Sequence, residues 1–130
     1  MKTVLVIDDD PQIISFLEAL LDEQGYRVLS SPNGKDALSL LETVIPDAII
    51  VDAMMPNIDG YQFLWHLRSA PKTERIPTIM LTSRSRAQDI QYGKSLGANV
   101  YLTKPVGPQE LTAALNYINL VAAEDTRHAS

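Results

Sequence analysis

Short apolar runs alternate with segments of helical spacing along the whole of this 130-residue chain. Each run has four or five residues, which suits a strand, and in each segment after it apolar residues recur three or four positions apart. We expect strands over residues 3–7, 26–30, 48–51, 78–81 and 100–103. Strands that alternate with helices in this way predict an α/β domain, in which helices cover both faces of a parallel sheet.

Proline, glycine and capping residues indicate where the expected helices begin and end. Pro11 and Pro108 stand at first helical positions, and Asp59 is placed to cap the segment that follows it. Gly25 and Gly97 follow the last apolar residues of their segments and so mark helix ends. The expected helices are 11–24, 34–45, 60–70, 86–96 and 108–121. We predict one domain over residues 1–121 and a short polar tail over 122–130.

Composition excludes several classes of function. The chain has no cysteine, which rules out a disulfide framework, a zinc–thiolate site and thiol catalysis. With 16 acidic and 11 basic residues its formal net charge is −5, the wrong sign for gripping nucleic acid or an anionic membrane directly. No apolar stretch approaches the roughly 20 residues that a membrane-spanning helix needs. We therefore expect a cytoplasmic protein.

Polar side chains follow the expected strands at their carboxyl ends. Asp8 and Asp9 come after the first strand, Asp52 after the third, Thr82 after the fourth and Lys104 after the fifth. In open α/β sheets ligands bind at this edge of the sheet. The spacing therefore predicts a site in which three carboxylates, a hydroxyl and an ammonium converge.

Three carboxylates that lie close together repel one another unless a cation offsets their charge. Oxygen ligands without histidine or cysteine suit Mg²⁺, which typically takes one or two carboxylates together with a phosphate oxygen. Lys104 adds a compact positive charge and Thr82 a hydroxyl donor. The expected ligand is a phosphoryl group with Mg²⁺ as the cofactor.

Four motifs in this order resemble the response-regulator receiver domain of bacterial two-component signalling. They are Val-Ile-Asp-Asp-Asp-Pro at 6–11, Asp-Ala-Met-Met-Pro-Asn-Ile-Asp-Gly at 52–60, Leu-Thr-Ser at 81–83 and Gly-Ala-Asn-Val-Tyr-Leu-Thr-Lys-Pro at 97–105. The resemblance covers about residues 2–121, and the four motifs together are specific although each alone is weak. It implies a flavodoxin-like, doubly wound (βα)5 fold with strand order 2-1-3-4-5.

The resemblance also implies a role for each site residue. Asp52 is the phosphoacceptor, with Thr82 and Lys104 as its catalytic partners, and Thr82 and Tyr101 form the switch. The Mg²⁺ ligands would be Asp8, Asp9, Asp52 and the backbone carbonyl of Met54. The family's lysine–proline bond is typically cis, which we expect here between Lys104 and Pro105.

The partners follow from the same resemblance. The usual phosphoryl donor is a phosphohistidine on a sensor histidine kinase or a histidine phosphotransfer protein. Phosphorylation remodels the surface of the fourth helix, fifth strand and fifth helix, which then meets a downstream protein target. Such a domain is a signalling phosphoacceptor that catalyses its own phosphorylation and dephosphorylation, and not an enzyme in the usual sense.

Four positions depart from the family's pattern or refine it. Val106 stands where phenylalanine is common, and Asn99 and Val100 replace an acidic pair found in members that dimerise through this face before binding DNA. Met54 offers no polar group to hold an attacking water, which predicts a relatively long-lived phosphoaspartate.

Two other functions remain open. In a phosphatase of the haloacid-dehalogenase type, Asp8 would be the nucleophile and Asp10 the general acid, but Pro11 stands where threonine or valine is expected. That alternative also leaves Asp52 unexplained. A degenerate receiver that serves only as a docking module is disfavoured because every required site residue is present.

Overall fold

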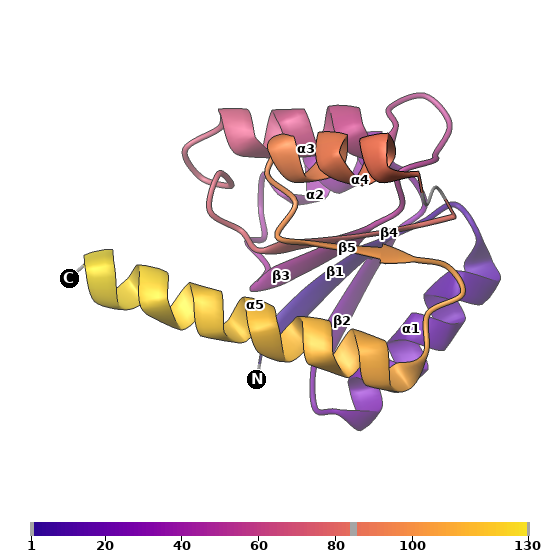
Figure 1. The fold of residues 1–130 in the computed structure, drawn as a ribbon, viewed down its shortest axis with the longest axis horizontal. Helices are drawn as coiled ribbons and strands as arrows, with labels where there is room; N and C mark the ends of the chain where they lie inside the picture. The colour runs from indigo at the N-terminus through magenta and orange to yellow at the C-terminus, as the bar shows by residue number, and fades with distance from the viewer. Residues whose placement is uncertain (1, 84–85, 130) are drawn as a thin grey trace.

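The computed structural model describes residues 2–83 and 86–129, and for residues 120–129 it describes the backbone alone. Five parallel strands form one sheet in the order β2-β1-β3-β4-β5 (Figure 1). They are β1 (Thr3–Ile7), β2 (Arg27–Ser31), β3 (Ala48–Val51), β4 (Thr78–Thr82) and β5 (Val100–Thr103). The expected α/β class and strand order are confirmed, and β2 begins and ends one residue later than the apolar pattern predicts.

Helices cover both faces of this sheet. They are α1 (Pro11–Glu23), α2 (Gly34–Leu40), α3 (Gly60–Ser69), α4 (Ala87–Ser95) and α5 (Pro108–Ala129). Figure 1 shows α2, α3 and α4 on one face and α1 and α5 on the other. Because successive side chains of a strand point to opposite faces, Leu5 and Ile7 of β1 join the core beneath α2 and α3, while Val4 and Val6 join the core beneath α1 and α5.

Local side-chain contacts fix the two helix starts nearest the site. The Asp10 carboxylate accepts a hydrogen bond of 2.9 Å from the Gln12 backbone N–H, and Pro11 follows as the first residue of α1. Asp59 caps α3 in a capping box with Gln62, in which each side chain accepts from the other residue's backbone N–H. Both helices begin where the proline and capping residues predict.

Two helix ends differ from their predicted positions. α2 stops at Leu40, four residues before Val44, because the backbone N–H groups of Glu42 and Thr43 bond to carbonyls three residues back, which tightens the last turn. α5 extends to Ala129, so that residues 122–129 continue this helix where a separate tail is predicted. The domain boundary at residue 121 stays a prediction, and the Val121 side chain lies outside the described residues.

Arg68 of α3 ties three segments together at the edge of the sheet opposite the site. Its guanidinium donates to the carbonyls of Gly97 (2.7 Å) and Ile76 (2.8 Å), and further bonds reach Glu74, Thr78 and Asn99. Burial lowers the pKa of this guanidinium. The side chain therefore joins α3 to the start of β4 and to the loop between α4 and β5.

Gly97 in that loop has φ of +105°, a backbone conformation that favours glycine.

Within the part of the chain that the structure describes, no helix is long and apolar enough to cross a membrane.

Candidate functional site

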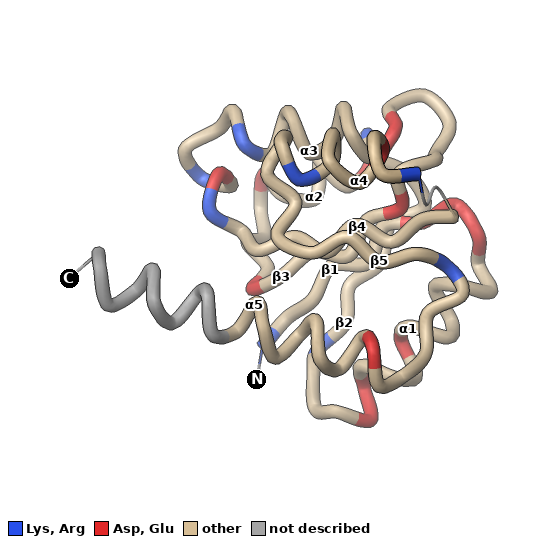
Figure 2. Tube along the Cα trace, in the orientation of Figure 1, with Lys and Arg blue, Asp and Glu red and all other residues tan. Residues whose placement is uncertain are grey.

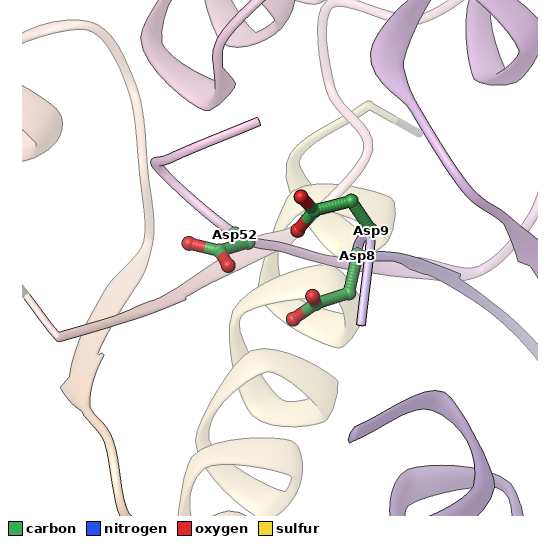
Figure 3. Close-up of side chains that lie close together, drawn as sticks. All are labelled: Asp8, Asp9 and Asp52. Atoms are coloured by element: carbon green, nitrogen blue, oxygen red, sulfur yellow. The ribbon is translucent and has the colours of Figure 1, made fainter. Parts of the chain in front are cut away.

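The carboxylates predicted to converge are brought together where β1 and β3 end side by side. β1 and β3 pair in parallel, with Ile7 opposite Val51, so the next residues of both strands emerge at the same edge. One carboxylate oxygen from each of Asp8, Asp9 and Asp52 lies within 4.8 Å of the others (Figure 3). Asp8 and Asp52 are buried, at 2% and 7% exposure, and Asp9 is exposed.

Lys104 reaches this cluster from the end of β5. Its backbone N–H donates to the Thr82 carbonyl at 2.8 Å, which extends the pairing of β5 with β4 by one residue. Its Nζ lies 2.8 Å from Asp52 Oδ2 and 2.9 Å from Asp8 Oδ2. The ammonium therefore bridges the two buried carboxylates, and the peptide bond to Pro105 is cis as expected. Figure 2 shows acidic and basic positions meeting at this edge of the sheet.

Backbone N–H groups hold the remaining oxygens of the buried acids. The Met54 N–H donates to Asp52 Oδ1 and the Asp10 N–H to Asp8 Oδ1, each at 2.9 Å. Each buried carboxylate thus has one oxygen on a backbone donor and the other on Lys104. These contacts fix the direction in which both carboxylates point.

Charge in the site is only partly balanced. Burial is the main cause of a raised pKa at Asp8, and the charge of Asp52 raises it further. Hydrogen bonds from the Asp10 N–H and Lys104 lower it, but the pKa is raised overall. Burial alone would lower the pKa of Lys104, but its hydrogen bonds and charge interactions with Asp52 and Asp8 outweigh that effect, and its pKa is raised. One ammonium faces three carboxylates, so the site favours a further cation.

The donor set fits Mg²⁺. All three ligand atoms that lie together are carboxylate oxygens, which hard divalent cations prefer. Burial raises the pKa of Asp8 although Lys104 opposes it, and a divalent ion would offset the carboxylate's charge further.

Thr82 and Tyr101 lie beyond the carboxylate cluster. Thr82 ends β4 and is fully buried, and its backbone carbonyl holds Lys104. Tyr101 is half-buried on β5, with its hydroxyl 3.0 Å from that of Tyr61 on α3. The side chain of Met54 is 45% exposed beside the site.

Tyr61 was missed from the sequence, although it is 6% exposed and contacts Tyr101. It lies three residues before Leu64, on the apolar face that the predicted helix already carries. Extending that face one turn towards the helix start identifies Tyr61 as an inward residue.

The fold and this edge of the sheet define a flavodoxin-like α/β protein with an acidic, lysine-bridged site at the carboxyl ends of its strands. Residues 4–116 match the model of the response regulator receiver domain family, and the chain belongs to that family. It is 35% identical over 118 residues to the protein PilH of Pseudomonas aeruginosa, a match that covers 91% of this chain and 98% of PilH.

Solved structures agree with this assignment. The chemotaxis protein CheY4 of Vibrio cholerae has a TM-score of 0.86 and 31% identity, over 91% of this chain and 98% of CheY4. The receiver domain of the sensor histidine kinase PA1611 of Pseudomonas aeruginosa, solved with a magnesium ion coordinated in its active site cleft, has a TM-score of 0.82 and 31% identity. It covers 91% of this chain and 98% of that domain.

Several curated relatives named as transcriptional regulators are longer. The chain spans between 45% and 51% of their length. The similarity to those relatives therefore concerns their receiver part.

Proposed function

We propose that this chain is a phosphoacceptor of a two-component phosphorelay and that Asp52 accepts the phosphoryl group from a phosphohistidine. The observation that carries this proposal is the bridge by Lys104 between the buried carboxylates of Asp52 and Asp8, with Asp9 beside them. A nucleophilic carboxylate held next to a fixed cation is suited to phosphoryl transfer, which depends mainly on positioning and charge.

The chemical step requires little from the protein beyond geometry. A carboxylate oxygen of Asp52 forms the new P–O bond while the P–N bond to the donor imidazole breaks, and the imidazole leaves with its electron pair and takes up a proton. Lys104 stabilises negative charge on the phosphoryl oxygens. The hydroxyl of Thr82 serves as a further donor to them.

Asp8, Asp9, Asp52 and the backbone carbonyl of Met54 are the residues that we assign to Mg²⁺. Bound there, the ion supplies positive charge to the phosphoryl oxygens. With the ion held there, the same site would promote both the phosphorylation of Asp52 and the later, slow hydrolysis of its phosphoaspartate.

The switch is assigned to Thr82 and Tyr101. The phosphoryl group adds roughly 1.5 to 2 negative charges and new acceptor oxygens. We propose that it draws the Thr82 hydroxyl inward and that Tyr101 turns towards the space that is vacated. The surface of α4, β5 and α5 then changes and binds a downstream protein, as a population shift between two states.

The phosphohistidine donor docks beside Lys104 in this proposal. A cavity of about 420 Å³ lies there, lined by Ile13, Phe16, Leu81, Lys104, Pro105 and Val106. Phe16 is 42% exposed, and Lys104 belongs both to this cavity and to the acidic site. An apolar helix of the donor seated here would bring its phosphohistidine close to Asp52.

The donor kinase draws on cytoplasmic ATP, so we assign the domain to the cytoplasm.

The phosphatase alternative gains no support from the geometry. Asp10, its general acid, caps α1 through the Gln12 N–H and is committed to the helix start. Asp8, its nucleophile, has its two oxygens on the Asp10 N–H and on Lys104.

The test is to incubate the protein with Mg²⁺ and a small acyl phosphate, then map the modified residue in wild type, Asp52→Asn and Asp8→Asn. We expect label on Asp52 in wild type and none in Asp52→Asn. Label on Asp8 would support the phosphatase instead. If the protein takes up no label from the acyl phosphate or from a phosphorylated histidine kinase, the proposal is contradicted. The remaining explanation would then be a degenerate receiver that serves only as a docking module.

A further inference from the structure

Three tyrosines from three elements meet next to the proposed switch. Tyr61 lies in the first turn of α3, Tyr92 in α4 and Tyr101 in β5. The hydroxyls of Tyr61 and Tyr101 are 3.0 Å apart, and the rings of Tyr61 and Tyr92 lie with centroids 5.1 Å apart. Tyr61 is thus the member that contacts both of the others.

Tyr101 packs closely against α4 in this arrangement. A Cβ placed on Gly93 would lie 3.0 Å from two ring carbons of Tyr101, so the ring rests directly on the helix backbone there. The half-buried ring has Met80 as its neighbour in the sheet register. We call this the inward position of Tyr101.

The Tyr61 hydroxyl depends on Tyr101 remaining inward. The Tyr61 residue as a whole is only 6% exposed, and Tyr101 is the partner that its hydroxyl reaches. If the Tyr101 ring turned outward, this buried tyrosine would lose that bond, which is unfavourable. The bond therefore favours the inward position.

We propose that Tyr61 is a positioning residue of the switch, whose hydroxyl holds Tyr101 inward and so favours the state that phosphorylation also favours. This inference rests on the proposed function, and it takes the position of Tyr101 against Gly93 and Tyr61 to be the one that phosphorylation of Asp52 favours. Linkage requires that whatever stabilises the inward state also strengthens binding of a phosphoryl group at Asp52.

Replacing Tyr61 with phenylalanine removes the hydroxyl and keeps the ring. A single neutral hydrogen bond shifts an equilibrium by about two- to tenfold. We expect Tyr61→Phe to weaken the binding of beryllofluoride, a stable phosphoryl analogue, by up to that factor in the presence of Mg²⁺. The loss is largest if the outward state dominates in the variant before the analogue binds.

The experiment measures two quantities in the intact chain. Nuclear Overhauser contacts between the Tyr101 ring and Gly93 report the inward population without any ligand, and calorimetric titration gives the beryllofluoride affinity. Tyr92→Phe is the matched control, because it removes an exposed tyrosine hydroxyl from the same cluster and leaves the Tyr61–Tyr101 bond intact. We expect weaker contacts and weaker binding in Tyr61→Phe only.

A double-mutant cycle separates this role from a general effect on packing. In a Tyr101→Phe background the Tyr61 hydroxyl has lost this partner, so adding Tyr61→Phe should leave beryllofluoride affinity unchanged. If Tyr61→Phe matches Tyr92→Phe in both measurements, or acts equally in the Tyr101→Phe background, the inference is wrong. If wild type binds no beryllofluoride, the proposed function fails, and the ring contacts still decide whether Tyr61 holds Tyr101.

Discussion

Asp8 and Lys104 show how single side chains set the charge of the site. Lys104 pairs with two buried carboxylates at once, and the third carboxylate, from Asp9, lies close by in the exposed part of the site. The raised pKa of Asp8 has burial as its first cause, and the charge of Asp52 adds to it. Without a metal ion, burial therefore makes the negative charge of Asp8 unfavourable in the folded protein.

This charge predicts a pH-dependent effect of Asp8→Asn. A carboxyl whose pKa is higher in the folded than in the unfolded chain stabilises the fold in acid, and this contribution is lost as pH rises through the folded pKa. We expect Asp8→Asn, with Mg²⁺ chelated, to raise the free energy of unfolding at pH 7 relative to wild type, with the difference shrinking towards pH 4. Urea denaturation at several pH values measures it.

Lys104→Met serves as the opposing variant. It leaves Asp8 and Asp52 buried without their ammonium, which should lower the free energy of unfolding at pH 7 by about 3 kcal/mol. If Asp8→Asn and Lys104→Met lose equal stability, the Lys104–Asp8 ion pair governs the stability of the site. The excess of negative charge would then not govern it.

Met54 predicts a slow loss of the phosphoryl group. Its side chain is 45% exposed two residues after Asp52 and has no polar atom suited to orienting a water molecule. We expect Met54→Asn to hydrolyse the phosphoaspartate several times faster, because an amide can hold the attacking water. Phosphate release after rapid removal of the phosphodonor measures this rate, with Met54→Leu as the control. If the phosphoaspartate of Met54→Asn is hydrolysed no faster than that of wild type, the prediction is wrong.

At the scale of elements, close packing of helix starts and loops holds the site in place. α3 begins directly against the loop that carries Asp52, and the Gly60 N–H donates to the Ala53 carbonyl at 3.0 Å. A Cβ on Gly60 would collide with the Asp52 carbonyl and would lie 2.7 Å from Ala53 Cα. This position requires glycine because the backbone of α3 packs directly against the backbone of Asp52 and Ala53.

Gly60→Ala should therefore displace the loop after β3. We expect it to lower the free energy of unfolding by about 2 kcal/mol and to slow labelling of Asp52, since the clash is with the Asp52 backbone itself. Gly107→Ala is the matched control, because the nearest atom to its Cβ would be 3.6 Å away. Denaturation and acyl phosphate labelling should show wild-type behaviour in the control. Normal labelling of Gly60→Ala would contradict this account.

Arg68 acts on three elements at once. Arg68→Ala leaves the carbonyls of half-buried Gly97 and buried Ile76 without their shortest bonds, and we expect a loss of about 3 kcal/mol in the free energy of unfolding. Arg68→Lys should recover little of it, since an ammonium lacks the planar fork that reaches several acceptors. Arg75→Ala, at an exposed position, is the control. If Arg68→Lys recovers the wild-type free energy of unfolding in full, a positive charge alone is sufficient for this stabilisation.

At the scale of the whole molecule, local sequence patterns predicted the elements and the sheet edge but not the contacts between distant segments. β1, β3 and β5 lie where their apolar runs predict, and polar residues directly after strands identified Asp8, Asp9, Asp52 and Lys104. The order of the strands came from the family resemblance, because periodicity does not rank strands across a sheet.

Tyr61 and Arg68 escaped prediction for the same physical reason. Their partners lie 40 residues away at Tyr101 and 29 residues away at Gly97, and the pairing exists only once α3, α4 and β5 have packed. Helical spacing indicates that such a residue faces inward but does not identify the side chain that it meets.

The bridge between Lys104 and Asp8 joins residues 96 positions apart. During synthesis Asp8 and Asp52 leave the ribosome first, and the ammonium that bridges their carboxylates arrives only with the end of β5. A nascent or truncated chain that stops short of residue 104 therefore has an incomplete site. Under the proposed function, efficient phosphotransfer to Asp52 would thereby require a chain that extends through residue 104.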